Sequence, residues 1–258
     1  MVQAFSAVRP AVFQTECEGQ SFFGTHGGCS VVVKLDNRVF VIIPKHCVGD
    51  YDPTDLVVPE DQLYGHIGVK PHVAMTFEGI EESAKQLDIE DIVVLAWHEE
   101  VPLNFGANIL DISDYRAIST VPGDQLAIFG IPKNLMTIND ETTSVVYNFY
   151  DAIDFDYSPH AELSFMRVAR GVIPEGPNET TGFSGGLVWN RSRNCLAGLT
   201  LRGGKSDREI IFHYIPFQTV YRLVAYTQFQ LVGRKLIPAP TEDWLATAKS
   251  QQKWNDIA

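Results

Sequence analysis

The sequence has no long apolar run, no internal repeat and no low-complexity segment. A membrane-spanning helix needs about 20 consecutive apolar residues, and every apolar run in this chain is much shorter. The first ten residues also lack the basic start and the sustained apolar core of a secretory signal peptide. We therefore expect a cytoplasmic protein with no membrane partner.

Positive charge and cysteine are scarce as well. The 258 residues include 20 Lys and Arg against 32 Asp and Glu, a net charge of −12. This balance argues against a nucleic-acid partner, because phosphates need a positive surface. The four cysteines, Cys17, Cys29, Cys47 and Cys195, form no CxxC pair. We therefore expect no metal site, no cofactor and, in a reducing compartment, free thiols.

The chain instead has many short β-branched or apolar runs, separated by polar residues, glycine or proline. The predicted strands cover residues 30–35, 38–43, 55–58, 73–77, 92–97, 125–130, 144–149, 162–168, 186–189, 195–201 and 209–214. Asp36-Asn37 predicts a hairpin between the first two, and further turns are expected at residues 190–192 and at Gly203-Gly204. This pattern favours an all-β barrel or sandwich over a parallel sheet.

Helices are expected only near the end of the chain. A helix opened by Pro216 would place four apolar side chains on one face: Phe217, Val220, Leu223 and Val224. A short tail helix is predicted within residues 236–258. Residues 101–119 lack periodicity, and we interpret them as the connection between two halves, residues 1–115 and 116–235.

Residues 181–189 hold an uncommon pattern, in which Ser184 is flanked by glycines and followed by an apolar run. Glycines allow a tight turn with positive φ, so backbone N–H groups near the serine can point outward together. Such a cluster of donors can hold a negative oxygen, which acyl transfer requires. A plain glycine-serine turn is the alternative interpretation.

A reactive serine needs a general base and a group that orients the base. His46 is the best base because it follows directly on a strong apolar strand, unlike the other histidines, His26, His66, His72, His98, His160 and His213. Asp91 is the best carboxylate because an apolar strand begins next to it, and Asp88 is its competitor. The alternatives are a loop histidine and a solvated acidic turn.

These segments resemble the catalytic motifs of the trypsin-like (chymotrypsin-fold) serine peptidases. Pro44-Lys45-His46-Cys47 is similar to the family's Ala-Ala-His-Cys element, residues 91–95 to its Asp-Ile-Ala-Leu-Leu element, and residues 182–186 to its Gly-Asp-Ser-Gly-Gly element. The order His, Asp, Ser is the family's, and the resemblance covers about residues 20–228. It implies two six-stranded antiparallel β-barrels, the first carrying His46 and Asp91 and the second carrying Ser184, with helices at the C-terminus.

The resemblance also implies a role for each residue. Ser184 would be the nucleophile, His46 the base, Asp91 its orienting partner, and the backbone N–H groups of Gly182 and Ser184 the oxyanion hole. The base of the substrate pocket would lie near Asn178, and its walls near Thr200, Leu201 and Arg202. The implied function is a serine endopeptidase that acts on a protein or peptide, with a regulatory protein partner possible.

Two positions bear on this assignment. Phe183 stands where secreted members carry an acid that pairs with a new N-terminus, so activation by that pairing should be absent. A binding module with a collapsed oxyanion hole stays open as an alternative, because Phe183 could tilt the donors. Cys29 and Cys47 resemble the family's disulfide next to the histidine, although a reducing compartment argues against the bond.

Overall fold

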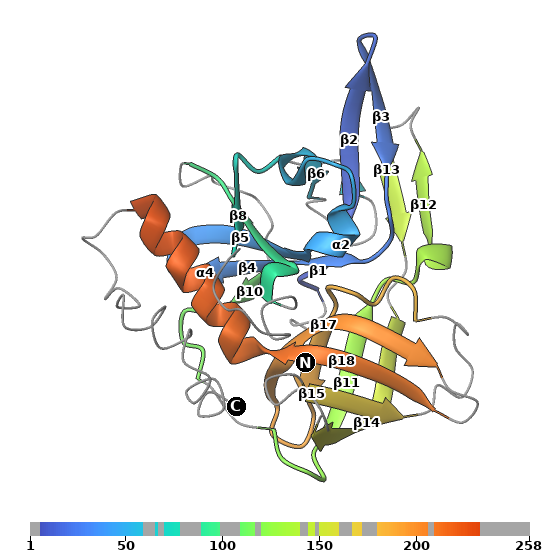
Figure 1. Ribbon diagram of the computed structural model, residues 1–258, viewed down its shortest axis with the longest axis vertical. Helices are drawn as coiled ribbons and strands as arrows, with labels where there is room; N and C mark the ends of the chain where they lie inside the picture. Colours follow the sequence, from blue (N-terminus) through green and yellow to red (C-terminus); the bar gives the residue numbers. More distant parts are fainter. Residues whose placement is uncertain are drawn as a thin grey trace.

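The computed structural model describes residues 6–58, 65–66, 70–77, 89–98, 109–116, 120–139, 144–147, 150–159, 167–171, 180–205 and 209–232. These residues form two β-rich halves, blue to green and yellow to orange in Figure 1, with one long helix, α4, at the end of the described chain. The predicted all-β class is confirmed.

The first half is built on a six-stranded sheet. Five strands follow one another in the order β1 (Val8–Pro10), β4 (Cys29–Leu35), β5 (Arg38–Pro44), β9 (Ile92–Ala96) and β8 (Val73–Thr76). Their pairings are antiparallel, while the sixth strand, β10 (Leu110–Asp111), pairs with β4 in parallel. The stretch interpreted as a plain connection between the halves therefore contributes a strand to this sheet.

The β4–β5 hairpin shows why this sheet is almost entirely apolar. Leu35 pairs with Arg38, so Asp36 and Asn37 form a two-residue turn in which Asp36 has φ +53°. Along β5 the side chains alternate between two cores. Phe40 and Ile42 pack into a cluster shared with the second half and with α4, whereas Val41 and Ile43 pack against β2 and β6. Both faces of the sheet are thus buried.

Two smaller sheets flank this one. The first has the order β3 (Gln20–Gly24), β2 (Val12–Cys17) and β6 (Leu56–Val57), where β6 follows a short 3₁₀ turn, η1 (Pro53–Asp55). Its β2–β3 hairpin projects from the body of the molecule (Figure 1). The second has the order β12 (Met136–Asn139), β13 (Ser144–Tyr147) and β7 (Gly65–His66), so it joins strands from both halves.

The second half is a closed antiparallel barrel of six strands. Their order is β11 (Gln125–Gly130), β14 (Tyr150–Pro159), β15 (Arg167–Gly171), β18 (Ile210–Pro216), β17 (Cys195–Lys205) and β16 (Leu187–Asn190), and β16 pairs back with β11. The barrel predicted for this half is confirmed. Closure of strand pairing is seen only here among the described residues, since the first half forms a six-stranded and a three-stranded sheet.

Two local predictions need comment. Gly203 and Gly204 lie inside β17 and pair with Phe212 and Ile211, so the predicted turn at these glycines is wrong. The helix predicted to open at Pro216 is α4 (Phe217–Val232), and all four side chains expected on its inner face are buried. The predicted tail helix lies outside the described residues.

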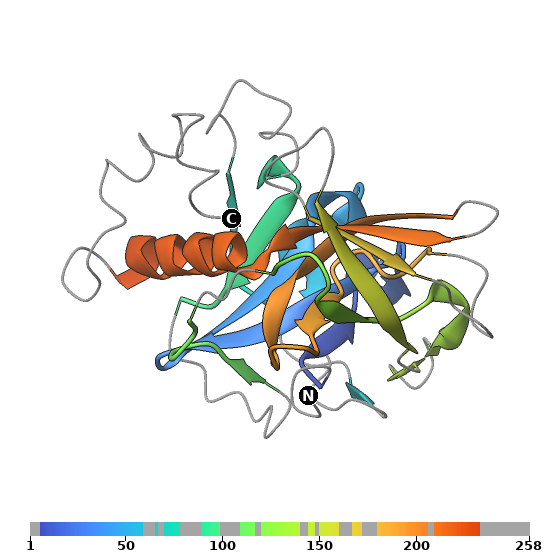
Figure 2. The same cartoon turned by 90° about the horizontal axis from the view of Figure 1, so that it is seen from below.

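The helix α4 leads away from the barrel after β18, as Figure 2 shows in red-orange, and packs against β9 of the first half as well as β17 and β18. Its apolar face therefore ties the two halves together. No helix among the described residues is both long enough and apolar enough to cross a membrane. Within the described ranges, the remaining helical turns are α2 (Lys45–Val48) and η2 (Lys133–Leu135).

Candidate active site

His46 and Asp91 are brought together by two adjacent antiparallel strands. Pro44, the last residue of β5, pairs with Ile92, the first residue of β9, so the chain leaving one strand lies beside the chain entering the other. His46 sits in the single turn α2 that follows β5. The N–H of Lys45 donates to the Asp91 carbonyl oxygen at 2.6 Å, which fixes the two segments in register.

Both carboxylate oxygens of Asp91 hold His46. The Asp91 Oδ2 lies 2.7 Å from His46 Nδ1, and Oδ1 accepts the backbone N–H of His46 at 2.9 Å. The Asp91 side chain is 18% exposed and that of His46 is 45% exposed, so the carboxylate is shielded while the ring still reaches the solvent. This contact fixes the ring and makes Nδ1 the nitrogen that carries a proton.

The same contact changes the acidity of the imidazole. Burial lowers the pKa of His46, but hydrogen bonding to Asp91 and Cys47 and the charge of the carboxylate outweigh it, so the pKa lies well above its ordinary value. Burial raises the pKa of the Cys47 thiol. The positively charged form of His46 is therefore the one that this site stabilises.

Ser184 is carried by a tight loop, residues 180–186, which we call the nucleophile loop. The loop turns through Gly182 at φ +100° and Gly185 at φ +82°, a region that favours glycine. A side chain at Gly182 would collide with the Ile131 carbonyl, and one at Gly185 with the Cys29 carbonyl. The two glycines therefore allow the loop to press directly against both halves of the molecule.

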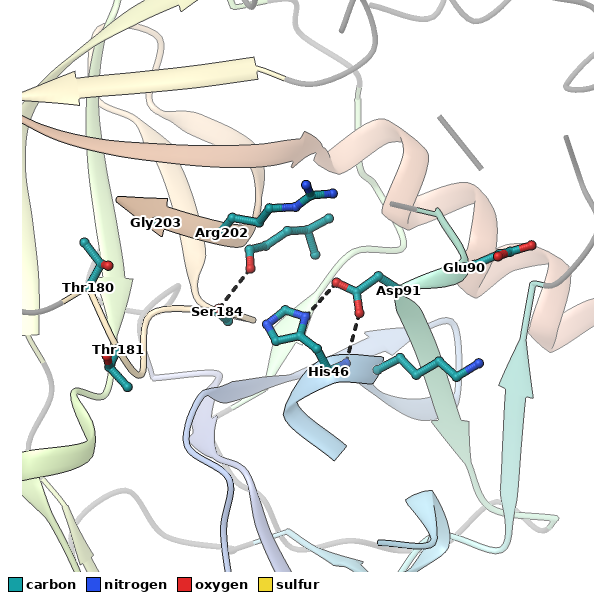
Figure 3. A pocket seen from close by; sticks show the side chains of 10 residues that line it. His46, Glu90, Asp91, Thr180, Thr181, Ser184, Arg202 and Gly203 are labelled. Carbon is teal, nitrogen blue, oxygen red and sulfur yellow. Dashed lines mark hydrogen bonds and ion pairs between the residues drawn. The ribbon is translucent and has the colours of Figure 1, made fainter. Parts of the chain in front are cut away.

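The Ser184 hydroxyl donates to the carbonyl oxygen of Leu201 at 2.9 Å. In Figure 3 the His46 ring lies between Asp91 on one side and Ser184 on the other. The three residues predicted from separate motifs therefore meet at one place. In the conformation seen, the hydroxyl is hydrogen-bonded to a backbone carbonyl and not to the imidazole.

These residues line one open cleft of about 650 Å³. Its lining comes from both halves of the chain: Lys45, His46, Glu90, Asp91, Thr180, Thr181, Ser184, Leu201, Arg202 and Gly203. Lys45, Glu90, Thr180, Thr181 and Gly203 were not predicted as site residues. All five lie within two positions of a predicted residue, so proximity to the motifs was the available signal.

The predicted substrate-pocket residues differ in their placement. Asn178 lies outside the described residues. Leu201 and Arg202 line the cleft, although the side chain of Leu201 is itself fully buried. Thr200 is fully buried behind the nucleophile loop and is not among the described residues that line the cleft. A register shift in β17 between Thr200 and Arg202 accounts for this placement, because it breaks the alternation of side chains.

Two residues of the cleft lining, Thr180 and Gly203, approach each other closely. A Cβ at Gly203 would lie only 2.7 Å from the Thr180 Cβ and 3.0 Å from the Phe212 ring. Gly203 therefore packs closely against Thr180, and the Phe212 ring lies beside the same position. The glycine at position 203 is what permits this close approach.

The backbone donors of the nucleophile loop point two ways. The N–H groups of Phe183, Gly185 and Gly186 donate within the protein, to the carbonyls of Thr180, Thr200 and Phe183 respectively. Within the described part of the chain, no acceptor takes the N–H groups of Gly182 and Ser184, the two predicted oxyanion-hole donors. The loop therefore holds two unused donors on either side of Phe183.

Several sequence alternatives can now be compared with the structure. Asp88 and His160 lie outside the described residues. His26 packs beside Tyr51, and the rings of His72 and His98 stack 5.8 Å apart, away from the cleft lining. The four cysteines are free thiols. Among the described residues, no group of three or more His, Cys, Asp or Glu side chains could hold a metal ion.

Sequence comparison with protein-family models found no match, and a search of curated proteins found none either. Solved structures do match in three dimensions. The fold is similar to human heparin binding protein, with a TM-score of 0.52 at 12% identity over 92% of this chain and 96% of that chain. It is also similar to neuropsin, a serine protease of mouse brain, with a TM-score of 0.51 at 14% identity over 87% and 96%.

A third similar structure is the scabies mite inactivated protease paralogue S-I1, with a TM-score of 0.50 at 12% identity over 90% of this chain and 97% of that chain. Likeness at such low identity shows the fold alone, and one of the three proteins is an inactivated protease, so activity must be argued from the site. The arrangement of strands and helix is that of the trypsin-like serine peptidases, and this chain has their fold.

Proposed function

We propose that this protein is a serine endopeptidase that cleaves peptide bonds through an acyl-enzyme. The observation that carries the proposal is the two-point contact between His46 and Asp91, at 2.7 and 2.9 Å, on the same cleft as Ser184. A serine hydroxyl is a weak nucleophile at neutral pH and needs such an oriented base. The shared cleft supports a common task for the three side chains.

In the proposed mechanism the Ser184 Oγ attacks the scissile carbonyl carbon while His46 Nε2 takes the hydroxyl proton. His46 then gives that proton to the leaving amine as the C–N bond breaks. Water, activated by the same imidazole, hydrolyses the acyl-enzyme and restores Ser184. Asp91 keeps the proton on Nδ1 and stabilises the imidazolium in each step. In this mechanism the Ser184 hydroxyl would leave the Leu201 carbonyl and turn toward His46 by rotation about the Cα–Cβ bond of Ser184.

The negative oxygen of the tetrahedral intermediate would be held by the N–H groups of Gly182 and Ser184. Their lack of an acceptor among the described residues supports this role. Each preorganised donor contributes about 3–4 kcal/mol to lowering the barrier in such sites. The two donors would therefore account for a large part of the rate enhancement.

The substrate would be an extended polypeptide lying along Leu201, Arg202 and Gly203. The contact between Thr180 and Gly203, with Phe212 behind it, favours a small side chain just before the scissile bond. We further propose that the protein acts on a partner protein in the cytoplasm, where its four free thiols would remain reduced.

The test is a comparison of wild type with Ser184→Ala in a digest of a cell extract, with the new peptide ends identified by mass spectrometry. The proposal requires cuts made by wild type that vanish in the variant. A wild type that makes no cuts, while its circular dichroism shows an intact fold, would refute it.

A second candidate is a protein-binding module on the same fold without turnover. The hydrogen bond between Ser184 and Leu201 favours it, because a hydroxyl held there is withheld from the base. In this case Ser184→Ala would bind protein partners as tightly as wild type, and neither would cleave them. Cleavage that depends on Ser184 would eliminate this candidate.

A further inference from the structure

An oxyanion hole works when its N–H groups face one point before the substrate arrives. In a planar trans peptide unit, the N–H and the C=O of the preceding residue point in opposite directions. The direction of the Ser184 N–H is therefore set by whatever holds the Phe183 carbonyl. Three consecutive carbonyls of the nucleophile loop, those of Gly182, Phe183 and Ser184, are held from outside the loop by side-chain or backbone donors.

Thr200 holds the central carbonyl. It lies in β17 behind the loop and is fully buried. Its hydroxyl contacts the Phe183 carbonyl closely and lies 3.0 Å from the Gly186 carbonyl. A threonine hydroxyl has one hydrogen to donate, and the closer contact assigns it to Phe183. The Thr200 backbone adds two bonds, accepting from Gly185 N–H at 2.7 Å and donating to Gly186 at 2.9 Å.

Cys29 holds the carbonyls on either side. It is the first residue of β4 in the other half of the molecule and is fully buried. Its thiol donates to the Gly182 carbonyl at 3.0 Å and accepts the Ile131 N–H at 3.2 Å. Its backbone N–H donates to the Ser184 carbonyl at 2.6 Å. Burial raises the pKa of the Cys29 thiol to about 12, so it keeps the hydrogen that it donates.

The Phe183 side chain supports the loop from the barrel interior. It is buried, its ring centroid lies 5.0 Å from that of Phe212, and it occupies the space that a side chain at Gly130 would need. The loop is thus anchored by an apolar ring below and by two polar side chains at its carbonyls. An ionic partner for position 183 is excluded, because phenylalanine carries no charge.

We propose that the Thr200 hydroxyl is a positioning group that sets the direction of the Ser184 N–H, and that the Cys29 thiol orders the adjoining Gly182–Phe183 peptide unit of the same loop. The proposal rests on the proposed peptidase function. Both groups are buried and act through the backbone of the nucleophile loop, without touching the substrate. They connect the two halves of the molecule to one loop, Cys29 from β4 and Thr200 from β17.

The first test compares Thr200→Val with Thr227→Val. Valine removes the hydroxyl with little change of shape, and Thr227 is an equally buried threonine in α4 whose hydroxyl donates to Leu223 at 2.9 Å. Thr200→Val is expected to lower kcat on peptide substrates by about 10- to 100-fold with KM within about twofold. Thr227→Val should leave both constants unchanged, and Thr200→Ser should recover most of kcat.

The second test does not depend on activity. Hydrogen–deuterium exchange of peptides covering residues 180–186 should be faster in Thr200→Val than in wild type or Thr227→Val, because the loop amides lose their order. Cys29→Ala should show the same change, while Cys29→Ser, whose hydroxyl can donate and accept, should show less. If Thr200→Val does not fold, the comparison of Cys29→Ala with Cys29→Ser takes the place of the comparison of Thr200→Val with Thr227→Val.

The outcomes separate the two proposals. An active wild type whose Thr200→Val and Cys29→Ala variants keep both kcat and the exchange pattern of residues 180–186 would overturn the positioning role and leave the peptidase standing. A folded wild type without turnover would overturn the peptidase. The exchange comparison would then still decide whether Thr200 and Cys29 order the loop.

Discussion

The Ser184 hydroxyl lies 2.9 Å from the carbonyl oxygen of Leu201 and donates to it. That carbonyl belongs to the wall of the cleft along which a bound polypeptide would run. A substrate N–H that donates to the same oxygen competes with the Ser184 hydroxyl and favours its rotation toward His46. Substrate binding would therefore complete the catalytic arrangement.

This relationship can be tested with a crystal structure of the protein bound to a peptide with a non-cleavable bond. We expect the Ser184 Oγ within about 3 Å of His46 Nε2, which is hydrogen-bonding distance, and a peptide N–H on the Leu201 oxygen. A bound peptide with Ser184 still donating to Leu201 would contradict the proposed rotation.

The pH dependence of activity should reflect the raised pKa of His46. Asp91 stabilises the imidazolium, so the neutral base is lost as the pH falls through this raised value, and kcat/KM should rise toward alkaline pH. Asp91→Asn removes the stabilising charge, so the acidic limb should move to lower pH while kcat falls by about 10⁴-fold. The measurement is kcat/KM against pH for both proteins.

The control for this profile is Asp111→Asn. Asp111 forms an exposed ion pair with Lys34 at 3.4 Å and does not line the cleft. Asp111→Asn should leave unchanged both the acidic limb of the plot of kcat/KM against pH and the value of kcat. If Asp91→Asn shifted the limb to higher pH, or not at all, the assignment of His46 as the base would be wrong.

Cleavage specificity should follow from the contact between Thr180 and Gly203. Substrates with Gly, Ala or Ser before the scissile bond are expected to be cut at least about tenfold faster than those with Phe, Lys or Arg, since a large side chain would clash with the joined walls. Thr180→Gly should reduce this preference by opening the contact. Digestion of a peptide library, followed by mass spectrometry, measures the preference of wild type and of Thr180→Gly. A wild-type preference for a large residue before the scissile bond would contradict the proposed selection of small side chains.

Asp124 should make folding stability depend on pH. It is 6% exposed, and its Oδ2 accepts from Asn190 Nδ2 at 2.8 Å, Arg193 Nε at 2.8 Å and the Val121 N–H at 2.9 Å. Burial raises the pKa of Asp124, but these bonds outweigh it and lower the pKa. The stabilisation is therefore present above the unfolded pKa of about 3.9 and is lost as the pH falls through the lower folded value.

Asp124→Asn is accordingly expected to reduce the free energy of unfolding by about 1–3 kcal/mol at pH 7. The difference from wild type should shrink at about pH 3, where the native carboxyl begins to protonate. Urea denaturation of wild type and Asp124→Asn at the two pH values measures this difference in the free energy of unfolding. An equal loss at both would show that the charge of Asp124 does not contribute.

The sequence predicted the elements that depend on local pattern. The β4–β5 hairpin was found because Asp36-Asn37 interrupts two apolar runs, and the inner face of α4 because its apolar residues recur at helical spacing. His46 and Asp91 were paired correctly because each adjoins an apolar strand end. Each of these signals is local, because it lies within a few residues of the residue or element that it identifies.

The misplaced features depend on contacts between distant segments. Thr200 was expected on the cleft, but the register shift in β17 turns it inward. Gly203 was expected in a turn, yet it lies inside strand β17, where the absence of a side chain lets Thr180 approach. The hydrogen bond of the Cys29 thiol to Gly182 in the nucleophile loop joins residues 153 positions apart, and no local pattern indicates it.

The most direct measurement of the central claim is the reaction of the folded protein with a fluorophosphonate, followed by intact mass and peptide mapping. We predict one adduct, located on Ser184, which is absent in Ser184→Ala and in heat-denatured wild type. We also predict much slower labelling in Asp91→Asn. A folded wild type that acquires no adduct, or an adduct on another residue, would contradict the claim that Ser184, His46 and Asp91 act together.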